Sequence, residues 1–209
     1  MKKSAILALL SYTLLTIVMT WPTVTHFTVG IPGDGFDGWQ NYWNQWWIKE
    51  ALLVKQTHFF FTDILYPPSG ASLLFHTLNF FNGLWTLPLQ LNFGLAVAYN
   101  SVVFFHFVFA GFGVFLFARY SLGTLKLCHG WANWGASLMA GAIFTFAPFH
   151  MAHLLGHMQV FSLTWPPFYM LWTFRLVNRW RLQPDLTLSK ADLALAGLFL
   201  AFTTMIDWY

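Results

Sequence analysis

The chain has 209 residues, of which 57% are hydrophobic and only 8% are charged. A soluble domain carries about 25% charged residues, so this chain has too little charge to cover a surface that faces water. This composition excludes a disordered protein, a disulfide-rich secreted module and an ordinary cytosolic enzyme. It predicts an all-α protein that crosses a membrane several times, with residues 1–209 as a single membrane domain.

The basic residues do not indicate a nucleic-acid partner. The formal net charge is +3, and the ten Lys and Arg residues are spread along the chain without a dense cluster. The single cysteine, Cys128, excludes an internal disulfide and a metal cluster of several cysteines. Gly111-Phe112-Gly113 lies in an apolar run and indicates close packing of helices rather than nucleotide binding.

Five apolar stretches approach the length of a membrane span, which needs roughly 20 residues, with a range of about 17–25. The first lies within residues 1–21 and follows two lysines, as a signal peptide would. It lacks an Ala-x-Ala cleavage site and ends in Trp21-Pro22, which suits an interfacial anchor, so we expect a retained span. The five expected spans cover residues 4–21, 97–118, 132–149, 158–174 and 191–206.

The number of crossings within residues 64–118 depends on the charge pattern, because this stretch contains no Asp, Glu, Lys or Arg. Two crossings would place every basic residue from Arg119 to Lys190 outside. One crossing places eight of the ten basic residues in the cytoplasm, as the positive-inside rule favours. We therefore expect five crossings of the cytoplasmic (inner) membrane, a cytoplasmic N-terminus and an outer loop over residues 22–96. Residues 77–94 then form a re-entrant or interfacial segment.

The outer loop contains the sequence GDGFDGWQNYWNQWW over residues 33–47. Glycines flank Asp34 and Asp37 and let the backbone turn tightly. These carboxylates either satisfy backbone N–H groups at a helix start or form part of a functional site. We expect a helix to begin at Asp37 or Gly38.

The tryptophans of this helix recur at helical spacing and predict one aromatic face. They are Trp39, Trp43, Trp46 and Trp47. The pattern favours an amphipathic helix anchored in the membrane interface over a platform on which sugars or bases stack. The residues expected on the remaining face are Asn41, Asn44, Gln45 and Lys49.

Two other segments carry candidate site residues. Tyr66 starts the turn sequence YPPSG, and His76 follows it. His150, His153 and His157 are spaced i, i+3 and i+7, which places them on one face if they share a helix. Their imidazoles either ligate a metal or bond lipid phosphates and backbone. We also expect His106 to bond across helices, and Asp207 to lie on the outer side with the three histidines.

Taken together, these segments resemble the N-terminal part of bacterial polytopic glycosyltransferases of the C-type fold. The matching sequences cover nearly the whole chain: GDGFDGWQNYWNQWW, YPPSGASLLFHT, LPLQLNFGLAVAYN, FLFARY, FAPFHMAHLLGHMQ and a terminal DWY. The resemblance implies a polyprenyl-phosphate sugar donor and an acceptor that approaches from the outer side. It also implies a first-loop carboxylate, Asp34 or Asp37, that acts as general base or helps to hold a divalent metal. The candidate substrate-binding residues are Tyr66, His76, His150, His153 and His157.

Two functions from different classes remain open. Members of the resembled class continue through more spans after the DWY motif, so this chain is either an N-terminal piece or a shortened relative. The first function is transfer of a lipid-linked sugar. The second is that of a non-catalytic accessory subunit in a larger membrane complex, such as an energy-transducing one. A transporter is less favoured, because the clearest spans carry no acidic residue. Lipid is a partner in each case.

Overall fold

The computed structural model describes residues 2–33, 35, 37–182 and 189–206. Contacts between residues divide the chain into two compact units, each made of several segments. Unit 1 comprises Met1–Met19, Phe104–Met151 and Ser162–Thr204, and unit 2 comprises Thr20–Val103, Ala152–Phe161 and Met205–Tyr209. The expectation of a single membrane domain stays a prediction.

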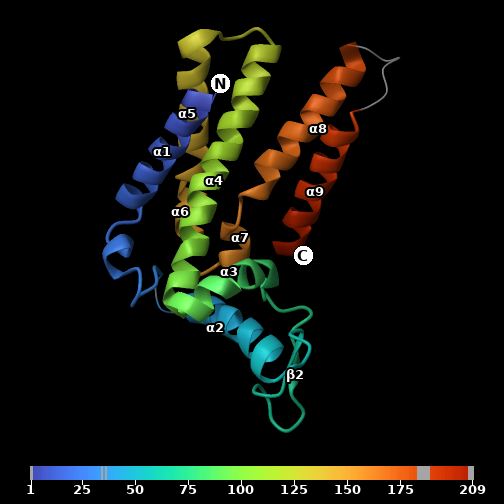
Figure 1. Ribbon diagram of the computed structural model, residues 1–209. Coiled ribbons are helices and arrows are strands. Elements are labelled where there is room, and N and C mark those ends of the chain that lie inside the picture. Colours follow the sequence, from blue (N-terminus) through green and yellow to red (C-terminus); the bar gives the residue numbers. More distant parts are fainter. Residues whose placement is uncertain (1, 34, 36, 183–188, 207–209) are drawn as a thin grey trace. The chain divides into compact units, whose positions relative to one another are not determined.

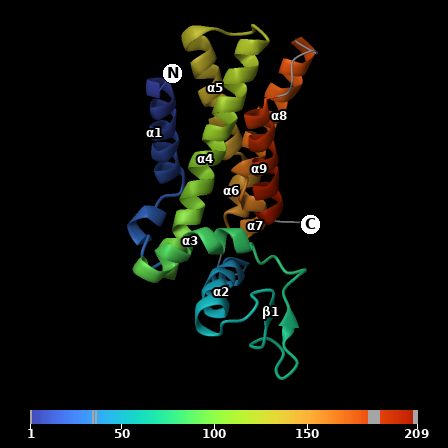
Figure 2. The ribbon, with the colours of Figure 1, turned by 45° about the vertical axis from the view of Figure 1, so that its right-hand side comes forward.

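Unit 1 is built from long apolar helices. They are α1 (Lys2–Met19), most of α4 (Leu95–Thr124), α5 (Gly130–Thr145), the start of α6 (Pro148–His153), α8 (Trp165–Leu182) and most of α9 (Lys190–Ile206). Helix α1 contacts α5, and α8 runs beside α9 (Figures 1 and 2). Apolar side chains such as Ile6, Leu10 and Leu14 stay exposed on α1. Helices with apolar residues all round need a large core or lipid to cover them.

Glycines let four of these helices, α1, α4, α5 and α8, approach closely. The ring of Tyr12 lies against Gly111 of α4 and Gly141 of α5, where a side chain would overlap it. Gly113 faces Phe168 of α8 at a similarly short distance. The prediction that the Gly111-Phe112-Gly113 sequence serves close helix packing is therefore confirmed. His106 also bonds another segment, since its Nδ1 lies 2.8 Å from Oγ1 of Thr164.

Unit 2 contains shorter elements. In chain order they are η1 (Thr23–His26), α2 (Asp37–Lys49), the π-helical turn η2 (Glu50–Val54), β1 (Phe61–Thr62), β2 (Ala71–Ser72), α3 (Phe80–Phe93), the first turns of α4, and α7 (Met158–Phe161). Strands β1 and β2 pair antiparallel, with Phe61 opposite Ser72. The predicted Tyr66 turn lies in the loop that connects them. Helix α2 packs against α3 in both views (Figures 1 and 2).

Two helix predictions are wrong, and both fail near prolines or glycines. The stretch 158–174 is not one helix but α7 and α8, with a break before Trp165. Starting α8 at Trp165 puts Pro166 and Pro167 in its first turn, where the missing N–H groups cost little. The three histidines do not share a helix either, because α6 ends at His153 and a turn around Gly156 separates it from α7.

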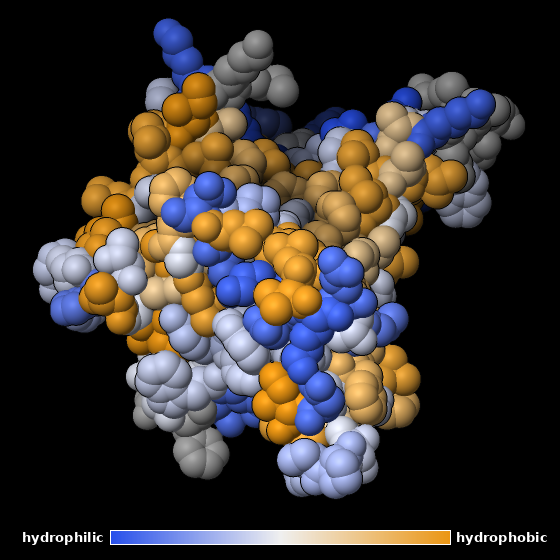
Figure 3. All heavy atoms as spheres, turned by 60° about the horizontal axis from the view of Figure 1, so that its bottom comes forward, coloured by the Kyte–Doolittle hydropathy of each residue, from blue (hydrophilic) through white to orange (hydrophobic). Residues whose placement is uncertain are grey.

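The fold is mostly helical, as the composition predicted. Two helical stretches, residues 95–124 and 130–153, are 30 and 24 residues long and apolar enough to cross a membrane by length and composition. Helix α1 is apolar but shorter. Figure 3 shows orange apolar side chains mixed with blue polar ones on the face that it presents. The two long apolar stretches point to association with a membrane.

Candidate functional site

The candidate site starts from the first residue of α2, Asp37. A carboxylate is stabilised at a helix N-terminus by the helix dipole and by N–H groups that have no partner within the helix. Gly35 precedes the helix with a φ of 80°, a conformation that side chains other than glycine rarely adopt. The prediction that the helix begins at Asp37 or Gly38 is confirmed. The other candidate carboxylate, Asp34, lies outside the described residues.

A carboxylate and an imidazole meet at this helix start. Oδ2 of Asp37 lies 3.0 Å from Nε2 of His157, and the two side chains are 40% and 50% exposed. Both residues belong to unit 2, although they are far apart in the sequence. At this distance the pair is hydrogen-bonded, and its partial exposure leaves it open to a substrate.

A glycine allows the His157 segment to reach α2. A Cβ atom on Gly156 would overlap the backbone N of Gly38 and the Cβ of Asp37. The amide of Asn41 then bridges the two segments, because its Nδ2 donates to the carbonyl oxygens of Gly156 and Asp37. The backbone contact therefore fixes which residues stand opposite Asp37.

Amide groups extend the site along one face of α2. Gln40 Nε2 donates to Oγ1 of Thr77 across 2.9 Å, and Asn44 Nδ2 donates to the Thr77 carbonyl oxygen across 2.8 Å. Oδ1 of Asn44 lies 2.9 Å from Nε2 of His76. Burial lowers the pKa of His76, so the neutral imidazole donates this hydrogen bond.

These groups enclose a small polar cavity of about 180 Å³. It is lined by Asp37, Gln40, Asn41, Thr77, Gly156, His157 and Gln159. Oδ1 of Asn41 and Oε1 of Gln159 are buried without a hydrogen-bond partner in the described part of the chain. Buried acceptors of this kind are normally satisfied by a protein group, water or ligand. The accessible chemistry of the cavity is therefore that of the Asp37 carboxylate and the His157 imidazole, whose side chains are 40% and 50% exposed.

The remaining predicted site residues lie in different places. The ring of His153 is 5.2 Å from that of His157, so it stays near the site. His150 belongs to unit 1, is fully buried and donates Nδ1–H to the carbonyl oxygen of Thr145 across 2.7 Å. Tyr66 is 77% exposed in the hairpin loop and does not line the cavity. His76 does not line the cavity, and its Nε2 donates to Asn44, which does not line it either.

A divalent metal has no ligand set in the described residues. No group of three or more His, Cys, Asp or Glu side chains among them lies close enough to hold an ion. Asp37 and His157 supply two ligands, whereas a bound zinc takes three or four protein groups.

The tryptophans of α2 share one helix, as predicted, but most of them pack inside unit 2. Trp43 and Trp47 stack with ring centroids 5.8 Å apart and an angle of 1° between their planes. Trp47 is fully buried with Ala51, Leu73 and Leu78. Only Trp39 is mainly exposed. These rings form a core, and their location in a membrane interface stays a prediction.

Three polar residues of α2 are buried, whereas an amphipathic helix in a membrane interface would expose them. Asn41, Asn44 and Gln45 are buried and not exposed to water. The spacing of Asp37, Asn41 and Asn44 at i, i+4 and i+7 places them on one helix face, and this shared face is the part of the arrangement that the sequence indicates. Burial of Asn41 and Asn44 is tolerated because each donates a hydrogen bond to a backbone carbonyl oxygen of another segment.

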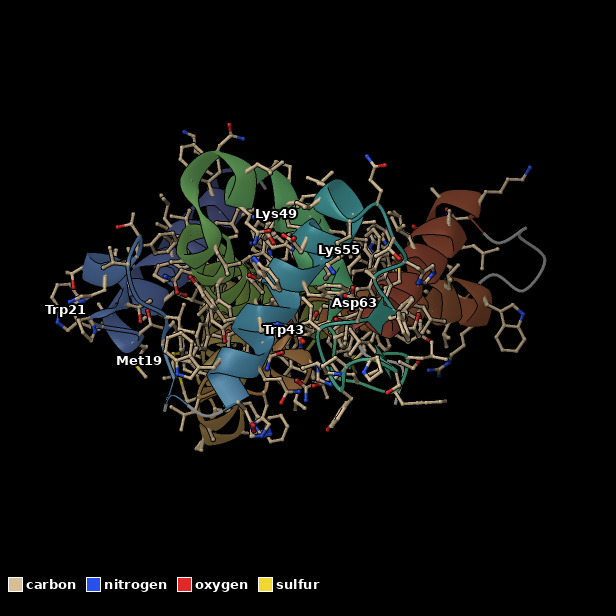
Figure 4. The ribbon with its side chains drawn as sticks, turned by 90° about the horizontal axis from the view of Figure 1, so that it is seen from below. Met19, Trp21, Trp43, Lys49, Lys55 and Asp63 are labelled. Carbon is tan, nitrogen blue, oxygen red and sulfur yellow. The ribbon has the colours of Figure 1, made fainter. Side chains whose placement is uncertain are left out.

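A second cavity of about 350 Å³ lies beside Trp47 and is lined by Lys55, Thr57, Phe61 and Asp63 as well. Nζ of Lys55 lies 2.7 Å from both carboxylate oxygens of Asp63, and Figure 4 labels both residues together with Trp43 on α2. Lys55 lowers the pKa of Asp63 by hydrogen bonding. Since each charge neutralises the other, this cavity is a weaker candidate site than the one at Asp37.

Comparison of the chain with models of protein families, with curated proteins and with solved structures gives no match. The candidate site therefore rests on its own geometry.

Proposed function

We propose that the chain is a multi-pass protein of the cytoplasmic membrane with five crossings and a cytoplasmic N-terminus. The crossings are α1, α4, α5 with α6, α8 and α9. The positive-inside rule supports this topology, because the topology places eight of the ten basic residues on the cytoplasmic side. Helices α1, α8 and α9 have 18, 18 and 17 residues, at the short end of the range of about 17–25 for a span.

The division into units gives independent support for this topology. Unit 2 is assembled from the segments 20–103, 152–161 and 205–209. With five crossings, these are the connection from α1 to α4 with the first turns of α4, the connection before α8 with the last residues of α6, and the residues that follow Thr204. All three lie on the outer side in this topology. Segments that face the same compartment are free to pack together, so the division into units agrees with the topology that the positive-inside rule favours.

The function we propose for the outer side is transfer of a sugar from a polyprenyl-phosphate donor, with Asp37 as general base. The observation that carries this proposal is the 3.0 Å contact between Asp37 and His157 at the polar cavity. An acceptor hydroxyl oxygen attacks the anomeric carbon, and its proton passes to the Asp37 carboxylate. The bond from that carbon to the phosphate oxygen breaks, and the phosphate keeps the electron pair. The identity of the donor comes from the resemblance of the sequence motifs.

The other cavity residues have supporting roles in this reaction. His157 orients the Asp37 carboxylate through the 3.0 Å contact between Nε2 and Oδ2. The amide side chains of Gln40, Asn41 and Gln159 line the cavity and make it polar, which suits a sugar. No step of the reaction written above uses a metal.

A second candidate function is that of a non-catalytic accessory subunit, and the size of the cavity favours it. Pockets that bury a whole small ligand measure about 300–1,000 Å³. The cavity at Asp37 measures about 180 Å³ and holds only part of a lipid-linked sugar. In this alternative, a larger membrane complex supplies the rest of any site, and Asp37 has no chemical role.

The test compares Asp37→Asn with Glu50→Gln in the purified chain reconstituted into lipid. Glu50 starts the turn after α2 and does not line the cavity. Glu50→Gln therefore removes the same charge as Asp37→Asn at a position outside the site. Release of labelled sugar from polyprenyl-phosphate hexoses is measured by extraction and counting. We expect Asp37→Asn to lower turnover about 10²–10⁴-fold, the usual share of general base catalysis, and Glu50→Gln to leave it unchanged. Equal turnover in Asp37→Asn and wild type, or no turnover in the wild type, rejects the transferase in favour of the accessory subunit.

A further inference from the structure

Unit 1 contains a separate cavity of about 470 Å³ that the proposed reaction does not use. Its walls come from α1, the end of α4 and the start of α5. The lining residues are Lys3, Ser4, Leu7, Arg119, Gly130, Trp131 and Trp134. The volume lies within the range of about 300–1,000 Å³ that is typical of small-ligand sites.

The cavity has two cations and no described counter-ion. Asp192 is the only acidic residue of unit 1 among the described residues, and it pairs with Arg175 and Arg179. Neither Lys3 nor Arg119 makes an ion pair within the described ranges. The site therefore carries an excess of positive charge that favours an anion.

Arg119 is held in place, and among the described residues its guanidinium group makes a single hydrogen bond. Its Nη1 donates to Oγ of Ser4 across 2.9 Å, and its Cζ lies 5.7 Å from the centre of the Phe115 ring. Trp134 Nε1 donates to the Ser4 carbonyl oxygen across 3.1 Å, which fixes the cavity wall. A guanidinium group has five N–H donors in a planar fork that matches the oxygens of a phosphate.

The other walls are apolar and exposed. Trp131 is 79% exposed and Leu7 is 45% exposed, and the Trp131 ring stands edge-on to Trp134 at 5.9 Å. A free phosphate or a soluble anion gains nothing from such walls. An amphiphile gains from both parts of the site, since its headgroup meets the cations and its chains meet Leu7 and Trp131.

We propose that this cavity binds the phosphate headgroup of an anionic phospholipid, held by Arg119 and Lys3. The proposal rests on the membrane topology proposed above, which places the cavity at the cytoplasmic leaflet, but not on any transfer activity. That leaflet is rich in anionic lipid, and basic pockets between membrane helices bind such headgroups. The polyprenyl-phosphate donor is not the occupant, because that topology puts the transfer site on the opposite side.

The test is retention of lipid by the purified chain, read by native mass spectrometry after delipidation and addition of phosphatidylglycerol or phosphatidylcholine. We expect the wild type to retain phosphatidylglycerol in preference to phosphatidylcholine. Arg119→Gln and Lys3→Gln should each weaken retention about fivefold, equivalent to about 1 kcal/mol per removed charge near a membrane surface. Lys126→Gln is the matched control, since Lys126 is exposed in the following loop and does not line the cavity.

Three outcomes overturn the proposal: equal retention of the two lipids, equal losses in Lys126→Gln and Arg119→Gln, or displacement of phosphatidylglycerol by millimolar inorganic phosphate. If Arg119→Gln fails to fold, Lys3→Gln and Trp131→Ala decide, because both side chains are exposed. Unchanged retention in these two variants also overturns it. Since no sugar donor is present, the result is independent of whether the transferase proposal holds.

Discussion

The hydroxyl of Tyr12 on α1 donates a hydrogen bond to the carbonyl oxygen of Leu138 on α5 across 3.0 Å. Tyr12 is fully buried, and its ring fills the space that Gly111 and Gly141 leave open. A polar group inside an apolar helix bundle is costly unless it is bonded, so this contact also fixes the register of α1 against α5.

Replacing Gly141 with Ala should destabilise unit 1. The new Cβ would overlap the Tyr12 hydroxyl and the backbone oxygen of Gly111, and a backbone atom cannot rotate away. Overpacking of this kind costs about 1–3 kcal/mol. Gly135→Ala on the same helix meets open space and should stabilise by up to about 1 kcal/mol. Thermal unfolding in detergent measures both. Similar melting temperatures for the two variants would contradict this account.

Replacing Gly83 with Ala should weaken the packing of α3 on α2 in unit 2. The Cβ would overlap the end of the Ile48 side chain, and Cβ and Cγ1 of Ile48 lie 3.3 Å away. We expect a loss of about 1–3 kcal/mol. Ile48→Val shortens the obstructing side chain, so the double variant should be more stable than the sum of the two single losses predicts. Additive losses in unfolding experiments would count against this contact.

Removing the charge of Asp192 should destabilise α8 and α9. Its buried carboxylate lies 3.0 Å from Nη1 of Arg179 and 3.6 Å from Nη2 of Arg175. Asp192→Asn should cost about 1.5–3 kcal/mol, the contribution of a hydrogen bond to a charged group. Asp63→Asn removes an exposed pair with Lys55 and should have a smaller effect that fades in high salt. Unfolding experiments at low and high ionic strength distinguish the two variants. If salt reduces the stability loss equally in both, the proposed effect of burial is contradicted.

Acidification should destabilise unit 2 through His76. Burial lowers the folded-state pKa of His76, so the unfolded state binds more protons between the folded value and the ordinary value near 6.5. Stability is therefore fully present above about pH 6.5 and falls as the pH is lowered toward the folded value. His76→Gln should flatten this dependence in thermal scans between pH 8 and 5. His58→Gln, at an exposed position of the same unit, should leave it unchanged. If stability still falls steeply on acidification in His76→Gln, another titratable group is responsible for the fall.

The sequence by itself determined the helical elements well. Runs of apolar residues predicted helices near 97–118 and 191–206, and the structure has α4 over Leu95–Thr124 and α9 over Lys190–Ile206. Glycines before Asp37 predicted the start of α2. These features depend on local composition, backbone freedom and the absence of helix breakers, which are properties of neighbouring residues. The break between α7 and α8 also has a local cause, because the pair Pro166-Pro167 favours a helix start at this point of the sequence.

Only the tertiary structure decided which side chains meet. The pattern in α2 identified an aromatic and an amide face, yet nothing local indicated that the amides would be buried. Their burial requires backbone partners at Gly156 and Thr77, which other segments bring to α2. The pairing of Asp37 with His157 depends on the turn at Gly156 and on the close backbone contact there. Buried polar groups are stable only where distant segments supply partners, and spacing along one segment does not contain that information.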